Sequence, residues 1–284
     1  MRNFTFKGLF LTAVFMLLGC LSIQAANDDL ITKQITIKLD KAGTLPDRIA
    51  SSKKYKITNL KLVGEINGTD WNMIREMAGR NYQESSTEGN LSVLDLSEAK
   101  IVAGGDYYYY DNLFNNKVYT SNDEIGEYAF AYCSGLTSLT LPVGITSIGE
   151  FAFSGCSGLT SLTLPAGITS IGEFAFSYCS GLTSIYVYAE KVPRIGRYAF
   201  EGCASRKCTL YVPKGTYDNY RLSEFGYFEN IVEFDATGID KTTTSTDVEE
   251  VSRYSVNGQR LAVPVKGLNI VKYSDGSARK VVVK

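Results

Sequence analysis

Four cysteines recur at one position of a repeated segment, and their thiols are the groups in this chain best suited to binding a metal or forming disulfides. They are spaced 23 or 24 residues apart: Cys133, Cys156, Cys179 and Cys203. A zinc site needs four sulfur atoms about 2.3 Å from one point, which a straight row does not provide. Parallel side chains on neighbouring strands lie about 5 Å apart, beyond the Cβ separation of a disulfide. We therefore expect buried free thiols and no metal, with Cys208 the cysteine best placed to form any disulfide.

Side chains that carry out catalysis are poorly represented. The chain contains no histidine, which removes Ser-His-Asp and Cys-His catalysis and histidine-bound metals. Glu127, Glu150 and Glu173 recur in register, but a surface row lacks the cleft and the unequal environments that a pair of glycosidase carboxylates needs. Neither phosphate-binding glycine motif occurs. We therefore predict no enzyme and no cofactor, with a carbohydrate- or peptide-active hydrolase as the weakest alternative.

A run of four tyrosines lies in a long insertion, Gly104 to Asn122, between two of the repeated segments. Long aromatic loops of this kind often contact a ligand. Two interpretations remain open: a binding loop, or a loop folded onto the edge of the repeats with half-buried rings. The ligand-binding candidates here are Tyr107, Tyr108, Tyr109 and Tyr110.

Further candidates occupy the alternate positions of the repeated strands, where side chains face solvent. They are Ser138, Thr140, Ser161, Thr163, Ser184, Tyr186, Tyr188 and Tyr211. Serine and threonine there give either a polar binding surface or simple solvation. Grouped tyrosines suit contacts with protein or sugar, although packing of a terminal cap explains them equally well.

A tandem unit of 23 residues positions the cysteines and the strand candidates. Its best copy is residues 147–169, SIGEFAFSGCSGLTSLTLPAGIT. The pattern L-x-x-L-x-L ends in the alternation of a short strand, and Pro142 and Pro165 terminate it. The segment IGEFAF then returns along the far side as a short helical or turn-like piece. Units of this length bury their apolar side chains by stacking, so we predict an α/β solenoid of parallel strands.

The same strand pattern, without the fixed spacing, occurs upstream. We expect six strands centred on Leu60, Leu94, Leu139, Leu162, Ile185 and Leu210, an edge strand near Ile37 and a helix that begins at Asp70. The predicted organisation is a signal peptide (1–26), an N-terminal cap with irregular repeats (27–123), tandem repeats (124–213), a C-terminal cap (214–236), a linker (237–250) and a β tail (251–284). Asp275-Gly276 predicts a hairpin turn within that tail.

The first 26 residues indicate export. Arg2 and Lys7 precede an apolar stretch too short to span a bilayer comfortably, and small residues follow it. Ordinary cleavage after Ala25 or Ala26 is one interpretation, and a lipid anchor at Cys20 is the alternative. No later stretch predicts a transmembrane helix. The formal net charge of the chain is −1, without a basic cluster, so we expect no nucleic-acid partner.

The I-G-x-x-A-F-x-x-C-x-x-L-x-x-L-x-L-P motif at 125–142, 148–165 and 171–188 closely resembles the BspA-like leucine-rich repeats of bacterial surface and secreted proteins. A looser copy covers 195–213, and the segment before the repeats resembles the N-terminal module of Bacteroides-type members. The tail, with Lys266-Gly267 and the terminal Lys280 to Lys284, is similar to type IX secretion sorting domains.

The resemblance implies adhesion and surface exposure. We therefore expect an exported or cell-surface protein that recognises a protein or glycan ligand on host or bacterial surfaces and is handled by the secretion and sorting machinery. The alternative is a structural, envelope-associated module without a dedicated soluble ligand.

Overall fold

The computed structural model describes residues 29–112 and 115–236, together with four strands of the C-terminal part. The chain divides into two compact units, Met1–Ala236 and Thr237–Lys284. The predicted signal peptide, Cys20, the linker up to residue 249 and the turn at Asp275-Gly276 lie outside the described residues.

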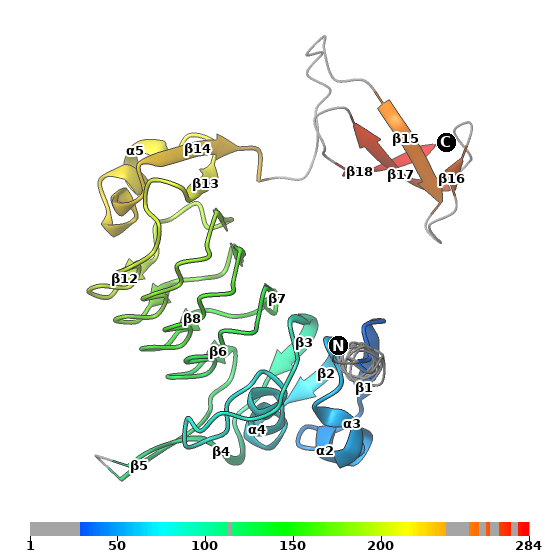
Figure 1. The fold of residues 1–284 in the computed structure, drawn as a ribbon. Helices are drawn as coiled ribbons and strands as arrows, with labels where there is room; N and C mark the ends of the chain where they lie inside the picture. Colours follow the sequence, from blue (N-terminus) through cyan, green and yellow to red (C-terminus); the bar gives the residue numbers. More distant parts are fainter. Residues whose placement is uncertain are drawn as a thin grey trace, which may run out of the picture. The chain divides into compact units, whose positions relative to one another are not determined.

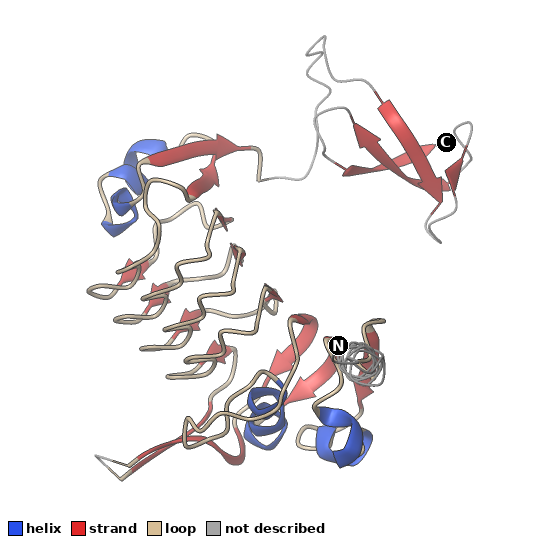
Figure 2. Ribbon diagram, viewed as in Figure 1, coloured by secondary structure: helices blue, strands red, loops and turns tan. Residues whose placement is uncertain are grey.

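One parallel sheet runs the length of the first unit (Figures 1 and 2). Every pair of neighbouring strands in it is parallel. In spatial order, the strands are β1 (Ile35–Leu39), β2 (Asn59–Ile66), β3 (Val93–Ile101), β7 (Ser138–Thr140), β9 (Ser161–Leu164), β11 (Ser184–Val187), β13 (Thr209–Pro213) and β14 (Asn230–Phe234). The predicted solenoid strands are confirmed, and β14 adds a parallel strand that the sequence pattern did not indicate.

The far side of each repeat is a turn and not a helix. Four parallel two-residue strands open these return segments: β6 (Glu124–Ile125), β8 (Ser147–Ile148), β10 (Ser170–Ile171) and β12 (Arg194–Ile195). No helix occurs between residues 124 and 213, a stretch that the structure describes throughout. Of the two predicted forms of the return, the turn-like one is correct.

Stacked aromatic rings fill the space between units. Phe153, fully buried, lies between the rings of Phe130 and Phe176 at centroid distances of 5.4 and 5.0 Å, with planes within 15° of parallel. In the adjacent row, the thiols of Cys156, Cys179 and Cys203 each donate to a phenylalanine carbonyl of the preceding unit at 3.1 Å. Because each unit supplies one wall of the next unit's core, a solenoid of this kind needs a cap at each end.

The N-terminal cap is built on helix α4 (Gly68–Met77). Asn67, and not the predicted Asp70, is the N-cap residue, because its side chain accepts from the amide of Thr69. Asp70 is the third helical residue and completes a capping box by accepting from the amide of Asn67 at 2.9 Å. It is fully buried and also accepts from the amide of Leu45 at 2.8 Å, so it joins α4 to the first residue of helix α2 (Leu45–Arg48).

Helix α4 also supplies hydrogen-bond donors to a backbone carbonyl of the first repeat. The indole Nε1 of Trp71 and the guanidinium of Arg75 both donate to the carbonyl of Ala129, each at 3.0 Å. In later units the equivalent carbonyl accepts from a backbone amide of the preceding unit. These buried side chains therefore take the place of a preceding repeat.

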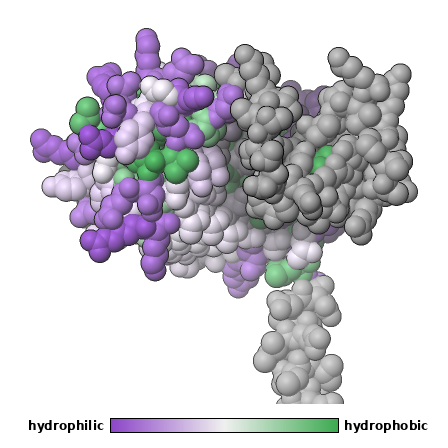
Figure 3. All heavy atoms as spheres, turned by 90° about the horizontal axis from the view of Figure 1, so that it is seen from above, coloured by the Kyte–Doolittle hydropathy of each residue, from purple (hydrophilic) through white to green (hydrophobic). Residues whose placement is uncertain are grey.

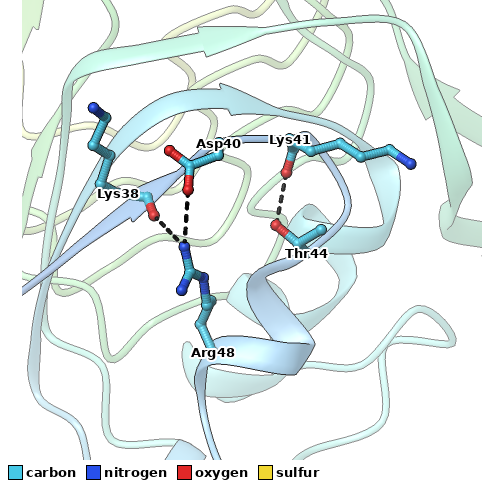
Figure 4. A network of polar contacts seen from close by, with 5 residues as sticks. All are labelled: Lys38, Asp40, Lys41, Thr44 and Arg48. Atoms are coloured by element: carbon cyan, nitrogen blue, oxygen red, sulfur yellow. Dashed lines mark hydrogen bonds and ion pairs between the residues drawn. The ribbon is translucent and has the colours of Figure 1, made fainter.

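A smaller surface network holds α2 against the end of β1 (Figure 4). Arg48 donates to the carbonyl of Lys38 and to the carboxylate of Asp40, both at 3.3 Å, while Thr44 donates to the carbonyl of Lys41. These groups are exposed, so the ion pair contributes little to stability. Helix α3 (Ser51–Lys54) follows directly and leads toward β2.

The C-terminal cap comprises helix α5 (Tyr217–Arg221), the 3₁₀ turn η1 (Glu224–Tyr227) and β14. The rings of Phe225 and Phe228 close the phenylalanine stack against Phe200, at centroid distances of 5.3 and 5.1 Å. The last repeat lacks a leucine at Lys207. Cys208, fully buried, occupies the core beside it.

The second unit is a small antiparallel sheet. Its strands are β15 (Glu250–Ser255), β16 (Arg260–Leu261), β17 (Gly267–Tyr273) and β18 (Ala278–Val283), in the order β16-β15-β17-β18. Strands β17 and β18 pair in antiparallel register from Gly267 opposite Val283 to Lys272 opposite Ala278. This pairing is the one that the predicted hairpin requires.

Candidate ligand-binding surface

The outer surface of the eight-stranded sheet changes in character along the solenoid. Ser138, Ser161 and Ser184 lie side by side on β7, β9 and β11, and Thr140 and Thr163 are exposed two residues further along their strands. Toward the N-terminal cap the surface is charged, since Lys61 pairs with Asp95 and Glu98. The serine and threonine candidates therefore form the polar middle of one continuous surface.

Aromatic side chains replace the serine and threonine rows at the C-terminal end of this surface. We call this group the aromatic patch: Tyr186, Tyr188, Tyr211, Val232 and Phe234. Tyr186 stacks on Tyr211 at 4.3 Å with planes 5° apart. Phe234 meets the rings of Tyr186 and Tyr188 edge-on, at 6.0 and 5.1 Å. The structure thus brings together the three tyrosine candidates of the sheet.

Register explains why the patch forms. Thr163, Tyr186, Tyr211 and Val232 are direct cross-strand partners on β9, β11, β13 and β14, so one threonine position of the repeat continues as aromatic and apolar residues. Val232 and Tyr188 remain 45% and 38% exposed, so the patch is open to solvent. Partial burial beside Tyr211 raises the pKa of Tyr186, which keeps its hydroxyl protonated at neutral pH.

Val232 and Phe234 were missed in the sequence because β14 has no L-x-x-L-x-L pattern. The alternation in NIVEF, residues 230–234, was the available signal, but it lies within a segment interpreted only as a cap. Parallel pairing of β13 with β14 carries both side chains onto the outer surface beside Tyr211.

The tyrosine insertion is a folded hairpin. Of the two open interpretations, the loop folded onto the edge of the repeats holds for two of its four tyrosines, which are therefore not ligand-binding residues. Strands β4 (Gly104–Asp111) and β5 (Asn116–Thr120) pair in antiparallel fashion. Tyr108 is 1% exposed, lies against Trp71 and donates to the carbonyl of Glu127 at 2.8 Å. Tyr109 is 7% exposed and stacks on Tyr128 at 4.2 Å. These two rings cover the first return segment, which leaves them no surface for a ligand.

Tyr107 and Tyr110, in contrast, are partly exposed. Tyr107 contacts Tyr82 and Tyr119 edge-on, and the ammonium of Lys117 lies 4.7 Å from its ring centroid. The hydroxyl of Tyr110 donates to Asn115 Oδ1 at 2.7 Å. These two rings stay candidates for ligand contact, but they lie apart from the aromatic patch.

The thiols are free, as predicted, throughout the described part of the chain: Cys133, Cys156, Cys179, Cys203 and Cys208 are all buried. Burial raises the pKa of Cys133 and of Cys208 to about 11, and that of Cys203 to about 12. A protonated, buried thiol is a weak nucleophile and a poor metal ligand. Within the described residues no group of three or more potential ligands is placed to hold a metal ion.

The pocket at the N-terminal cap offers little to a hydrolase. The pocket between α2 and α4 has a volume of about 290 Å³ and includes Glu76 and Asp106. Glu76 is paired with Lys54, and Asp106 accepts from the hydroxyl of Thr69 at 2.9 Å. Both carboxylates thus already have partners. Three exposed glutamates, Glu127, Glu150 and Glu173, follow the return segments in a row.

In the described part of the chain, no helix is long and apolar enough to cross a membrane.

Comparison with known proteins identifies the repeats. Residues 103–224 match the family model of the BspA type leucine rich repeat region, in 6 copies. Among solved structures, the chain is similar to a leucine-rich repeat protein from Bacteroides ovatus ATCC 8483, at 22% identity and a TM-score of 0.35. That similarity covers 72% of this chain and 42% of the other, so the chain spans less than half of that protein's length. No curated protein matches the chain. The chain therefore carries a BspA type leucine-rich repeat region, folded as a leucine-rich repeat solenoid.

Proposed function

We propose that this protein is a recognition module that binds a protein or glycan through the outer surface of its sheet, with the aromatic patch as the main contact. The observation that carries the proposal is the cluster around the stacked Tyr186 and Tyr211, open to solvent at Tyr188 and Val232. Tyrosine suits this role because it offers a large contact area and a hydroxyl at low entropic cost.

The polar rows beside the patch support the same role. Ser161 accepts from the hydroxyl of Ser184 at 3.0 Å, and both groups lie next to the tyrosines on a rigid sheet. A central aromatic cluster with hydrogen-bonding groups around it is the usual composition of a binding surface. Leucine-rich repeats also favour a binding role over catalysis, and the unit exposes an extended surface in place of a deep cleft.

We further propose that the protein acts outside the cytoplasm, at the cell surface or in the medium, where its ligand is a host or bacterial macromolecule. The apolar N-terminal segment supports export. The separate β sheet of the second unit, which adds no strand to the solenoid sheet, suits recognition by the secretion machinery. Deleting residues 248–284 in the native host should then reduce the amount of protein that reaches the surface or medium. Export at full yield would contradict the sorting role.

The binding proposal is tested by screening the purified chain against matrix proteins and mucin glycans, and mapping any complex by hydrogen exchange. We expect slower exchange on binding at β11, β13 and β14. Slower exchange confined to the hairpin β4–β5 would move the site to Tyr107 and Tyr110. A screen without any ligand would favour the structural, envelope-associated alternative.

A further inference from the structure

The return segments form a ladder of backbone hydrogen bonds, and the donor amides at alternate positions all belong to the preceding unit of each pair. In each unit, amides at alternate positions donate to carbonyls of the next unit, as Phe151 does to Glu173 at 3.0 Å and Phe153 to Ala175 at 2.7 Å. The pattern repeats where Phe174 donates to Arg197 and Phe176 to Ala199. The last unit therefore presents the equivalent donors, the amides of Tyr198 and Phe200, at its C-terminal edge.

The same edge also presents a hydrogen-bond acceptor. The carbonyls of Ile125, Ile148 and Ile171 each accept from the glycine amide of the following unit, at 2.7 to 2.8 Å. The equivalent group in the last unit is the carbonyl of Ile195. Within residues 29–112 and 115–236, no hydrogen bond forms at the amide of Tyr198, the amide of Phe200 or the carbonyl of Ile195 toward a following segment.

The C-terminal cap covers only part of this edge. Tyr227 reaches the third donor position, at Gly202, and its hydroxyl donates to the carbonyl of Cys203 at 2.9 Å. Beside the first two donor positions lies a pocket of about 170 Å³. It is lined by Ile195, Gly196 and residues 198–201 on one side and by Glu224 and Tyr227 of the cap on the other. A second, more open pocket continues from it past Leu222.

Exposure and charge indicate what this edge accepts. Leu222, Tyr198 and Tyr227 are 79%, 59% and 42% exposed, and the end of the first unit shows apolar areas among polar ones (Figure 3). Glu201 and Glu224 supply carboxylates to the pocket. Adjacent backbone amides also suit an anion, but two carboxylates beside them oppose one.

We propose that the edge formed by Ile195, Tyr198 and Phe200 binds an extended peptide that carries lysine or arginine. The peptide continues the ladder: its carbonyls accept from the amides of Tyr198 and Phe200, and one of its amides donates to the carbonyl of Ile195. A basic side chain of the peptide lies between Glu201 and Glu224. Addition of a strand to an open edge is a common form of peptide recognition. This site is distinct from the aromatic patch, which is on the sheet.

Amide hydrogen exchange of the full chain, followed by NMR, tests the proposal. In the free protein, the amides of Tyr198 and Phe200 should exchange faster than those of Phe174 and Phe176, which are bonded in the ladder. A heptapeptide of alternating valine and lysine, at millimolar concentration, should slow exchange at both amides by about tenfold or more. The valine–glutamate counterpart should not. Unchanged exchange with the lysine peptide, or equal slowing by both peptides, would overturn the proposal. Slowing by inorganic phosphate alone would identify an anion site instead.

Charge reversal separates recognition from folding. The double variant Glu201→Lys, Glu224→Lys should keep its melting temperature, because both side chains are exposed, lose the response to the lysine peptide and respond to the glutamate peptide. If the lysine peptide still protects both amides in this variant, the assigned role of the two carboxylates is wrong. Replacing Tyr186 and Tyr211 should leave the peptide response unchanged, so this site and the aromatic patch can fail independently.

Discussion

The two long surfaces of the solenoid differ in how they use the repeat. On the return side, each unit repeats the same contacts: a buried phenylalanine, a buried thiol and amides bonded to the next unit. On the outer surface of the sheet, the buried leucines repeat while the side chains between them change from charged to polar to aromatic. The invariant side therefore carries the packing between units, and the variable side carries the aromatic patch that we propose as the main contact for a ligand.

Because of this difference, substitutions on the return side should lower stability, and substitutions on the outer surface of the sheet should leave it nearly unchanged. A change on the return side is felt by two interfaces, because each unit packs against the one before and the one after it. A change on the outer surface of the sheet removes a group that faces solvent, and such changes usually alter stability by about 0.5 kcal/mol or less.

The largest expected effect is at Phe153. Phe153→Ala should lower the free energy of unfolding by about 3–5 kcal/mol, because it opens a cavity between Phe130 and Phe176. Urea denaturation measures the loss. Thr163→Ala, on the exposed side of a neighbouring strand, is the matched control and should change stability by about 0.5 kcal/mol or less. Similar losses in the two variants would erase the contrast between the surfaces.

Close approach of backbones provides a second test. A Cβ on Gly172 would lie 2.5 Å from the amide nitrogen of Glu150 and 2.6 Å from the carbonyl carbon of Gly149, so Gly172→Ala must push two units apart. We expect a loss of about 1–3 kcal/mol. At Gly167 the nearest atom to such a Cβ is 3.5 Å away, so Gly167→Ala should lower the stability much less. Thermal denaturation of both variants measures the difference. Equal melting temperatures for the two variants would show that the units are not in tight backbone contact.

The buried thiols predict how stability depends on pH. Burial raises the pKa of Cys133 from 9.0 to about 11, and that of Cys156 well above the same value. Above pH 9 the unfolded chain loses these protons while the folded chain keeps them, so stability is full below pH 9 and falls as the pH rises toward the folded pKa. Urea denaturation at pH 8 and pH 10 should show this fall. Cys156→Ala should reduce the difference by about 1.4 kcal/mol. An unchanged difference would mean that this thiol is not buried in solution.

The strands could be predicted from the sequence because buried leucines alternate with polar residues at a fixed spacing. The free thiols followed from the same spacing, since parallel rows hold side chains about 5 Å apart. The form of the return could not be predicted, because it depends on Tyr128, Phe151 and Phe174 adopting φ angles of 53° to 55°. Aromatic residues rarely adopt such angles, and stacking between units accompanies them here.

The candidate site was predicted only in part. Tyr186, Tyr188 and Tyr211 were found because they occupy outward positions of recognisable strands. Phe234 was missed because its strand lies outside the repeat pattern. For Tyr108 and Tyr109 the sequence left a binding loop and a packed loop both open, because a run of tyrosines does not reveal which rings face the core. Contact with Trp71 and Tyr128, distant in sequence, decides it.

The contrast between the two surfaces is tested most directly by removing the aromatic patch without disturbing the repeat. Tyr186→Thr with Tyr211→Thr extends the threonine row of β9 across two more strands and should lower stability by only about 1 kcal/mol. Tyr178→Gly, on the return side, is the control, because Gly155 and Gly202 occupy the same position in neighbouring units. For any ligand found in the screen, we predict that the double variant loses affinity by about tenfold or more while Tyr178→Gly binds like the wild type. Unchanged affinity in the double variant, or an equal loss in Tyr178→Gly, would contradict a recognition site on the sheet.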